Sequence, residues 1–391
     1  MNCINIKSKT NCCGCGACAD ICPKSCIQMK QDEDGFIYPF VDSRICLSCG
    51  KCKTVCPFLQ ADITKNIIDD CDAYAYVASD YKCVRSSSSG GAFSLLMDAF
   101  ASDGDYVIIG AAMDGMQVKH IITRDASHHA LLRKSKYVQS RTDGIFKSTE
   151  ELLKASKKVL FSGTPCQVAA LKSYLGQDYD NLLTVDIVCH GVPSQTVFDE
   201  YIQEIEAKYS SKIISVEFRY KRDFNTEKAN PRTINIIFEN GKSVNLAIAE
   251  SEFLYAYHTG LLHRPSCSAC KFATPSRSGD ITLGDYWGIE KKYPELSSLR
   301  GVSLVRFNTE KGRLLFENFK KSGIFIKTDW AFACAENNQL TNPLVPHRNR
   351  DKFFKLRLRG IPFCKNVEIC KKPDNLVQKI IRKIRHLIGL K

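Results

Sequence analysis

Eight of the 20 cysteines in this 391-residue chain stand in two copies of one spacing. Each copy reads C-x2-C-x2-C-x3-C-P, and the second begins 34 residues after the first. This spacing is typical of paired 4Fe–4S clusters, in which the last cysteine of each copy ligates the other cluster. We therefore expect one cluster on Cys12, Cys15, Cys18 and Cys56, and a second on Cys46, Cys49, Cys52 and Cys22.

The third cysteine and the Cys-Pro ending of each copy distinguish the pattern from a zinc module. Two zinc sites would need only C-x2-C pairs. Gly14, Gly16 and Gly50 let the backbone turn close to iron and aim N–H groups at sulfur. Three further cysteines fall outside the pattern and are expected to be spare thiols: Cys3, Cys13 and Cys26.

Another group of cysteines is spread over the middle of the chain. Cys166 stands in FSGTPCQ and Cys189 in VCHGVPS, each after an apolar run and before a helical pattern, while Cys267 and Cys270 form a C-x2-C pair. Four thiolates suffice for a further cubane, and strand ends of an open α/β sheet share one edge, so these cysteines can converge. Cys166 has two alternatives: a nucleophile with His190 as its base, or a packed apolar residue.

Two polar loops contain groups that would hold an anion. Residues 85–92, RSSSSGGA, place four hydroxyls and two glycines before an apolar helix, which presents N–H groups to a phosphate. Residues 133–141, RKSKYVQSR, mix cations, amides and an aromatic ring, which suits a dinucleotide or an acidic substrate. Neither is a Rossmann or Walker sequence. Taken alone, a serine-rich linker explains the first loop equally well, and a solvated basic turn explains the second better.

Alternating strand and helix patterns must position these groups. Short apolar runs predict strands at 72–77, 105–110, 158–161 and 182–188, and alternation predicts strands at 213–220 and 233–238. Helical patterns cover 92–102, 148–155, 168–175 and 195–209. Residues 32–39 predict a short hairpin between the cysteine repeats, and the polar segment 60–72 predicts a linker. The fold class is therefore α/β, with a mixed sheet flanked by helices behind a small N-terminal module.

The formal charge of +13 invites a nucleic-acid interpretation, but the cysteines weaken it. A 4Fe–4S cube with four thiolates carries about −2, so two or three cubes remove about 4 to 6 units. We expect no nucleic-acid partner. No signal peptide and no run of 18 apolar residues are visible, so a cytoplasmic, reducing environment is expected.

The last residues read as a proline-started amphipathic helix, residues 373–391. Its apolar side chains fall on one face and its lysines and arginines elsewhere. Docking on the body or on a partner is one reading, and peripheral contact with anionic lipid at the inner face of the membrane is the other. Three nearby cysteines lack cluster spacing and are expected to be spare thiols: Cys334, Cys364 and Cys370.

With these motifs assembled, the chain resembles the coenzyme F420 hydrogenase/dehydrogenase beta-subunit family, in the form with a fused N-terminal two-cluster ferredoxin domain that accompanies bacterial polysaccharide loci. The resemblance spans about residues 10–330. It rests on the two cysteine repeats and on six motifs in matching order: SSSSGG at 86–91, SKYVQS at 135–140, FSGTPCQVAALK at 161–172, CHGVPS at 189–194, CSAC at 267–270 and GDITLGDYWG at 279–288.

The resemblance implies non-covalent FAD on the α/β body and an additional 4Fe–4S cluster beside it. Its position-by-position carry-over assigns the additional cluster to Cys166, Cys189, Cys267 and Cys270. It assigns flavin contacts to Ser87, Ser88, Ser89, Gly90, Gly91, Lys136, Gln139, Gly163, Thr164, Pro165 and Gln167. The implied domains are a two-cluster module at 1–62, a flavin-binding body in two parts at 63–150 and 151–360, and a basic tail at 361–391.

The resulting expectation is an FAD- and iron–sulfur-dependent oxidoreductase. It would move electrons between ferredoxin-type clusters and FAD, to or from a two-electron substrate that is a deazaflavin-like coenzyme or a glycan or small-molecule precursor. The alternative is an electron-transfer subunit that feeds a separate catalytic partner. Expected partners are a ferredoxin or other redox protein and a small-molecule substrate; no catalytic residue is assigned.

Overall fold

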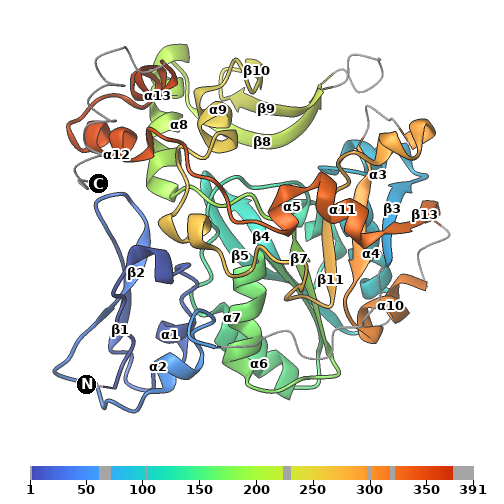
Figure 1. Ribbon diagram of the computed structural model, residues 1–391, viewed down its shortest axis with the longest axis horizontal. Helices are drawn as coiled ribbons and strands as arrows, with labels where there is room; N and C mark the ends of the chain where they lie inside the picture. The colour runs from blue at the N-terminus through green and yellow to red at the C-terminus, as the bar shows by residue number, and fades with distance from the viewer. Residues whose placement is uncertain are drawn as a thin grey trace.

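The computed structural model describes residues 2–60, 72–102, 104–222, 230–296, 301–317 and 322–372. These residues form an N-terminal domain, a large sheet covered by helices, and a smaller sheet with its own helices (Figure 1). The predicted linker at 60–72 and the predicted helix at 373–391 fall almost wholly outside the described residues.

The N-terminal domain contains one hairpin and two short helices. Strands β1 (Ile27–Gln31) and β2 (Ile37–Val41) pair antiparallel, which confirms a hairpin between the cysteine repeats. Helices α1 (Ala17–Asp20) and α2 (Lys51–Thr54) each contain the third cysteine of a repeat, Cys18 or Cys52. The two repeats therefore fold as similar loop–helix units on either side of the hairpin.

The large sheet has eight strands in the order β13-β3-β12-β11-β7-β6-β4-β5. Four central strands, β4, β6, β7 and β11, run parallel, and the outer strands pair antiparallel, so the predicted mixed sheet is confirmed. The strands are β3 (Asp72–Ala78), β4 (Tyr106–Asp114), β5 (Gln117–Thr123), β6 (Lys158–Gly163), β7 (Leu182–Ile187), β11 (Ile281–Asp285), β12 (Ser303–Phe307) and β13 (Gly323–Asp329).

Alternate residues of the central strands face opposite layers of helices. Val107 and Ile109 pack with α6 (Ile145–Lys154) and α7 (Pro165–Leu175), while Ile108 between them packs with α4 (Ala92–Ala101). Both faces of the strands are buried, which explains their nearly continuous apolar sequences. The remaining helices of this part are short: α3 (Tyr81–Arg85), α5 (His129–Leu132), α10 (Glu310–Glu317) and α11 (Trp330–Glu336).

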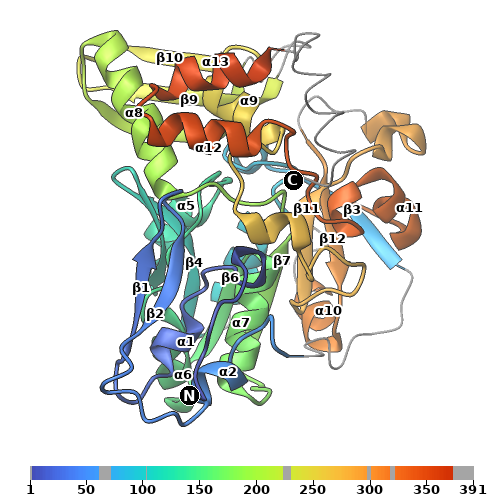
Figure 2. The ribbon, with the colours of Figure 1, turned by 60° about the vertical axis from the view of Figure 1, so that its left-hand side comes forward.

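Residues 213–247 form a separate sheet. Strands β8 (Ile213–Arg222), β9 (Asn230–Phe238) and β10 (Ser243–Ala247) pair antiparallel in the order β10-β9-β8. Four helices share its core, and α12 and α13 lie side by side over it in Figure 2: α8 (Gln195–Tyr209), α9 (Glu252–His258), α12 (Arg350–Leu358) and α13 (Phe363–Lys371). The sequence predicted the strands at 213–220 and 233–238, but not that they leave the main sheet.

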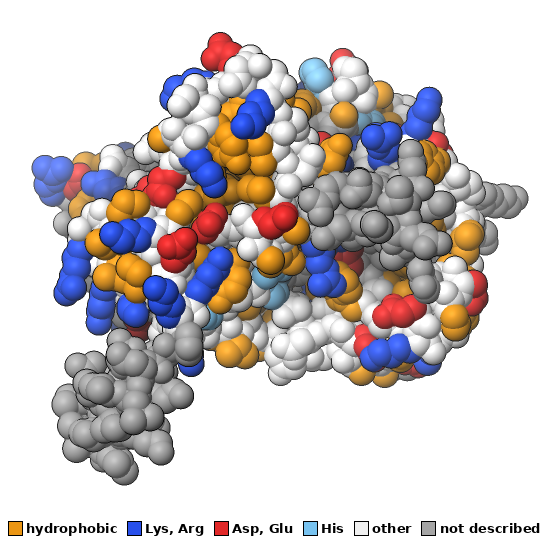
Figure 3. All heavy atoms as spheres, turned by 90° about the horizontal axis from the view of Figure 1, so that it is seen from above, with side chains coloured by type: hydrophobic (Ala, Val, Ile, Leu, Met, Phe, Trp, Pro, Cys, Tyr) orange, Lys and Arg blue, Asp and Glu red, His pale blue; other side chains and the backbone are white. Residues whose placement is uncertain are grey.

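Charges of both signs are interspersed over the face seen from above (Figure 3). Among the described helices, none is long and apolar enough to cross a membrane.

Candidate functional site

The first ligand set comprises Cys12, Cys15 and Cys18 from one repeat and Cys56 from the other. Burial raises the pKa of Cys18 well above its usual value, and Cys15, Cys12 and Cys56 lie close enough to raise it further. Burial likewise raises the pKa of Cys56 to about 11, with Cys15 and Cys12 again nearby. The structure thus brings together the four thiols that the crossed spacing assigns to one cluster.

The second ligand set comprises Cys46, Cys49 and Cys52 together with Cys22 of the first repeat. All four line one pocket in the N-terminal domain. Two cysteines that the spacing left as spare thiols line it as well: Cys3 lies beside Cys46, and the Cys26 sulfur lies 3.3 Å from that of Cys22. These two thiols are therefore neighbours of the ligand set.

Backbone N–H groups point at ligand sulfurs in this domain. The distance from N to Sγ is 3.4 Å from Gly14 to Cys12, 3.1 Å from Ile4 to Cys52 and 3.5 Å from Ser48 to Cys46. Such donors stabilise thiolates, and soft thiolates are the ligands that iron–sulfur clusters use. The donor chemistry of both sets therefore fits clusters.

The third set, called the third ligand set below, is a candidate one predicted from the sequence: Cys166, Cys189, Cys267 and Cys270, which the fold of the body brings together. Strands β6 and β7 are parallel neighbours, so Cys166, at the second residue of α7, and Cys189, after β7, lie at one sheet edge. Cys267 and Cys270 belong to the turn that begins at Pro265. All four line a single cavity of about 290 Å³, called the central cavity below.

In the chain without metal, most of the third set is protonated at neutral pH. Burial raises the pKa of Cys267 to about 12 and that of Cys270 to about 11, and it raises the pKa of Cys189 well above its usual value. Any metal that these thiols bound would therefore displace protons. Among the described residues, no three His, Cys, Asp or Glu side chains converge on a single ion position.

Cys166 differs from the other three. A hydrogen bond from the Cys13 thiol lowers the pKa of Cys166 to about 7, and a contact with Thr164, whose Oγ1 lies 3.2 Å from the sulfur, lowers it as well. The imidazole proposed as a base for a Cys166 nucleophile does not line the cavity, and His190 Nε2 instead lies 3.2 Å from the His258 carbonyl oxygen. The surroundings of Cys166 therefore favour the ligand interpretation.

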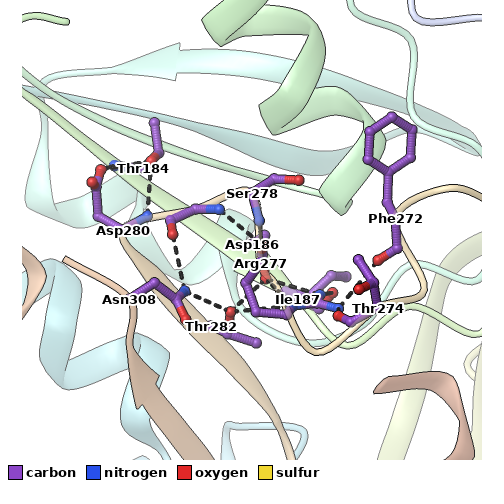
Figure 4. Close-up of polar contacts among 11 residues, drawn as sticks. Thr184, Asp186, Ile187, Phe272, Thr274, Arg277, Ser278, Asp280, Thr282 and Asn308 are labelled. Atoms are coloured by element: carbon purple, nitrogen blue, oxygen red, sulfur yellow. Dashed lines mark hydrogen bonds and ion pairs between the residues drawn. The ribbon is translucent and has the colours of Figure 1, made fainter. Parts of the chain in front are cut away.

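A buried ion pair holds the two cysteine-bearing segments together (Figure 4). Asp186 in β7 accepts from Arg277 Nη2 at 3.0 Å and from the backbone N–H groups of Ser278 and Gly279 at 2.9 and 2.8 Å. Arg277 in turn donates to the carbonyl oxygens of Ile187 and Phe272. This network fixes the segment after Cys270 to the end of the strand that precedes Cys189. Sequence reasoning missed both residues, because neither belongs to a spaced motif.

The flavin contacts expected from the resemblance line the central cavity with one exception. Ser87, Ser88, Ser89, Gly91, Lys136, Gln139 and the segment 163–167 all contribute to the lining. Gly90 does not: a Cβ there would lie 2.1 Å from the Tyr76 carbonyl oxygen, so the residue packs against strand β3. Close packing between loop and sheet requires a glycine at this position, and a flavin contact at Gly90 stays a prediction.

The serine hydroxyls of this loop already have partners inside the protein. Ser87 bonds Ser94, Ser88 bonds Ser135, and Ser89 donates to the Val302 carbonyl oxygen at 2.7 Å. The Ser303 hydroxyl accepts from the Gly90 N–H at 2.9 Å and lies 3.4 Å from the Ala92 N–H at the start of α4. The loop therefore shapes the cavity wall, and fewer of its groups are free than the sequence indicates.

The cavity lining is strongly cationic. It includes Arg133, Lys134, Lys136, Arg264 and Arg277, and Asp285 is the one carboxylate among the described lining residues. Burial lowers the pKa of Lys136 to about 7 and that of Lys134 to about 8, although Lys134 also forms an ion pair with Glu217, which favours its charged form. Arg133 Nε is buried with no hydrogen-bond partner among the described residues. A cationic cavity with an unsatisfied donor fits an anionic cofactor.

Two basic side chains of strand β8 near the cavity were not predicted from the sequence. Arg219 donates to the Ser88 carbonyl oxygen and to Asp285, each at 2.9 Å, and Lys221 donates to the carbonyl oxygens of Val84 and Ser89. Arg219 lies at a register shift in the strand with φ near +59°. Only the pairing of β8 and β9 reveals that shift, so no sequence signal marks these residues.

Arg264 joins the N-terminal domain to the central cavity. This side chain is 1% exposed; it donates to the carbonyl oxygens of Cys12 at 2.7 Å and Ile37 at 2.8 Å, and to Gln139 Oε1 at 3.2 Å. A Cβ at Gly14 would lie 2.7 Å from its Nη1, so the docked position requires glycine there. The first ligand set is consequently held against the wall that carries the third.

Comparison with known proteins is consistent with this geometry. Residues 156–330 match a family model that describes the C terminus of the beta subunit of coenzyme F420 hydrogenase/dehydrogenase, and residues 11–59 match a 4Fe–4S dicluster domain. No curated protein matches the chain.

A chain of the F420-reducing [NiFe] hydrogenase complex from Methanosarcina barkeri is similar in structure, with a TM-score of 0.45 and 15% sequence identity. The alignment covers 77% of this chain and 96% of that one. The chain thus combines a 4Fe–4S dicluster domain at residues 11–59 with a region, residues 156–330, that matches the C-terminal part of the coenzyme F420 hydrogenase/dehydrogenase beta-subunit family.

Proposed function

We propose that this protein is an iron–sulfur flavoprotein oxidoreductase that passes electrons between its dicluster domain and FAD in the central cavity, by way of a third 4Fe–4S cluster. One observation carries the proposal: the third ligand set and nearly all the expected flavin contacts line the same cavity. Bound FAD would supply the conversion between hydride and single-electron chemistry.

The chain's own residues have separate roles in this proposal. Cys166, Cys189, Cys267 and Cys270 hold the third cluster, while Arg133, Lys134 and Lys136 attract the anionic part of the cofactor. Arg264 and Gln139 keep the N-terminal domain docked. The rings of Phe58 and Phe272, 5.6 Å apart, pack in one group with cysteines of the first and third sets and help to exclude water. The substrate would be a two-electron acceptor or donor, either a deazaflavin-like coenzyme or a glycan or small-molecule precursor.

An alternative is that the chain feeds electrons to a separate catalytic protein. The face around the second ligand set supports this possibility, because Cys49 is exposed and Leu47 and Ile45 are 61% and 51% exposed. Lys24 and Lys51 are exposed on the same face. A ferredoxin or another acidic redox protein would fit such a surface. Peripheral membrane contact through residues 373–391 stays a proposal from the sequence alone.

Anaerobic purification with iron, sulfide and flavin quantified together tests the main proposal. We expect about twelve iron atoms and one FAD per chain. A measured content of about eight iron atoms per chain would rule out the third cluster. Stoichiometric zinc would rule out the dicluster assignment. A purified chain that turns over a soluble two-electron substrate without a second protein would exclude the electron-feeding alternative.

A further inference from the structure

Cys13 is a buried thiol between two ligand sets. The sequence left it as a spare thiol, yet it is 9% exposed and lines the central cavity. Its side chain packs in one group with Cys15 of the first set and Cys166 of the third. Cys15 and Cys166 are themselves close enough for the charge of one to affect the other. Cys13 thus contacts one ligand of each neighbouring set.

The position of Cys13 is fixed from several sides. Its carbonyl oxygen accepts from Gln139 Nε2 at 2.8 Å, and Gln139 Oε1 accepts in turn from the buried Arg264. Phe58, Ala169 and Phe272 surround it in one apolar group. The backbone of Cys13 is therefore tied to the docking of the N-terminal domain, and the residues packed around its side chain hold the sulfur near both sets.

A thiol has one proton and here has two acceptors. When iron holds Cys15 and Cys166 as thiolates, only one of them can accept the S–H of Cys13 at a time. A hydrogen bond to a ligand sulfur stabilises the more negative, reduced state of its cluster and so raises the reduction potential. The proton is consequently more stable on the side that holds the extra electron.

We propose that Cys13 is a shared hydrogen-bond donor between the first and third clusters, and that its S–H turns toward whichever of Cys15 and Cys166 carries the greater negative charge. The inference rests on the third cluster of the proposed function. No bond of Cys13 breaks and its sulfur is not oxidised. One electron leaves one cluster and arrives at the other, while the Cys13 proton stays on its sulfur and changes acceptor.

The test uses the full chain, purified anaerobically, with Cys13→Ala and Cys13→Ser. Cys364→Ala serves as the control, because it also removes a partly buried thiol but does not line the cavity. Iron content, the reduction potential of each cluster by EPR-monitored titration, and deuterium couplings after exchange into D2O are measured for all four proteins.

We expect Cys13→Ala to keep about twelve iron atoms. Its first and third clusters should become harder to reduce, by about tenfold in the equilibrium constant, since each loses a donor to a charged group. The second cluster should not change, and an exchangeable deuterium coupling should be lost. Cys13→Ser keeps a hydroxyl donor and should recover part of both effects, while Cys364→Ala should match the wild type.

Unchanged potentials in Cys13→Ala with about twelve iron atoms would overturn the shared donor and leave the proposed function standing. Loss of about four iron atoms in both variants would overturn it as well, since Cys13 would then be needed to hold a cluster. A wild-type chain with only about eight iron atoms would instead overturn the proposed function, and the shared donor with it.

Discussion

In the N-terminal domain the ligand cysteines lie within residues 12–56, whereas the third ligand set spans residues 166–270. The first eight are held by two short loop–helix units whose geometry follows from local spacing. The third set depends on the pairing of β6 with β7, on the start of α7 and on a turn more than 70 residues further along. A ligand set formed by neighbouring residues should therefore survive a substitution elsewhere in the fold. A set assembled from distant segments should depend on the contacts that align those segments.

The two regions also differ in how their charged groups are paired. Arg44 pairs with Asp42 on the surface of the N-terminal domain, with 86% of the arginine side chain exposed. Arg277 pairs with Asp186 inside the body, where the two side chains are 1% and 0% exposed. Breaking a buried pair leaves a charge without compensation, whereas water replaces a surface partner at little cost.

The largest expected effect separates these two pairs. Arg277→Met should lower the free energy of unfolding of the body by about 3–5 kcal/mol, because Asp186 stays buried without its cation. The third ligand set should lose its iron, while the two sets of the N-terminal domain keep theirs. Urea unfolding and iron analysis measure both effects. The matched Arg44→Met should leave stability and iron content unchanged, and equal behaviour of the two variants would refute the contrast.

The next effect tests whether the two regions bind iron independently. Cys166→Ser should lose about four of about twelve iron atoms and keep the EPR signals of the two N-terminal clusters. Cys364→Ser, which changes a thiol outside all three sets, should lose none. If Cys166→Ser instead kept all its iron and lost activity, Cys166 would be a nucleophile.

A smaller effect concerns the contact between the N-terminal domain and the body, which Arg264 forms. Arg264→Met leaves the carbonyl oxygens of Cys12 and Ile37 without their donor, and we expect local opening there to become easier by about 2 kcal/mol. Backbone amides of residues 12–16 should then exchange with deuterium roughly 30-fold faster. Arg141→Met, which removes an exposed ion pair with Asp143, is the control. Equal exchange in the two variants would mean that Arg264 does not hold the domains together.

The smallest effect concerns the cationic wall of the cavity. Lys136 has a pKa of about 7 in the free protein, so above pH 7 it must take up a proton to meet an anionic cofactor. FAD affinity should therefore fall as pH rises above 7, by at most about tenfold per unit for one proton. FAD titrations at pH 6.5 and 8.5 measure the slope. The slope should be shallower in Lys136→Met, with a remainder from Lys134, which also lines the cavity and has a pKa of about 8.

The control for this last prediction is Lys147→Met, which changes an exposed lysine of α6. Its pH dependence should match that of the wild type. An unchanged slope in Lys136→Met would show that Lys136 does not meet the anionic part of the cofactor.

Local patterns predicted much of the fold. The helix predicted at 195–209 is α8, Gln195–Tyr209, and three of the four central strands, β4, β6 and β7, were predicted to within a few residues at each end. Such segments are buried on one or both faces, so their periodicity is strong. The separation of β8–β10 into a second sheet was not predictable, because alternation shows that a strand has a buried face but not which sheet supplies it.

The spare thiols show that local spacing does not predict contacts between distant parts of the chain. Spacing put Cys3, Cys13 and Cys26 outside the ligand pattern. It does not indicate that Cys13 also lies near Cys166, or that Cys3 and Cys26 line the pocket of the second set. Arg264 and Arg277 are single arginines in polar surroundings, and their burial follows from the docking of the N-terminal domain and from the path of residues 271–280.

The sequence by itself determined the chemistry of the ligands, the division into an N-terminal cluster domain and an α/β body, and many of the longer elements, because these depend on residue type and short-range spacing. Only the tertiary structure decided that the third ligand set shares a cavity with the serine and lysine loops. It also decided that Gly90 serves packing, and that Cys13 lies between two ligand sets. These facts depend on contacts between segments far apart in the chain, which close only when the sheet assembles.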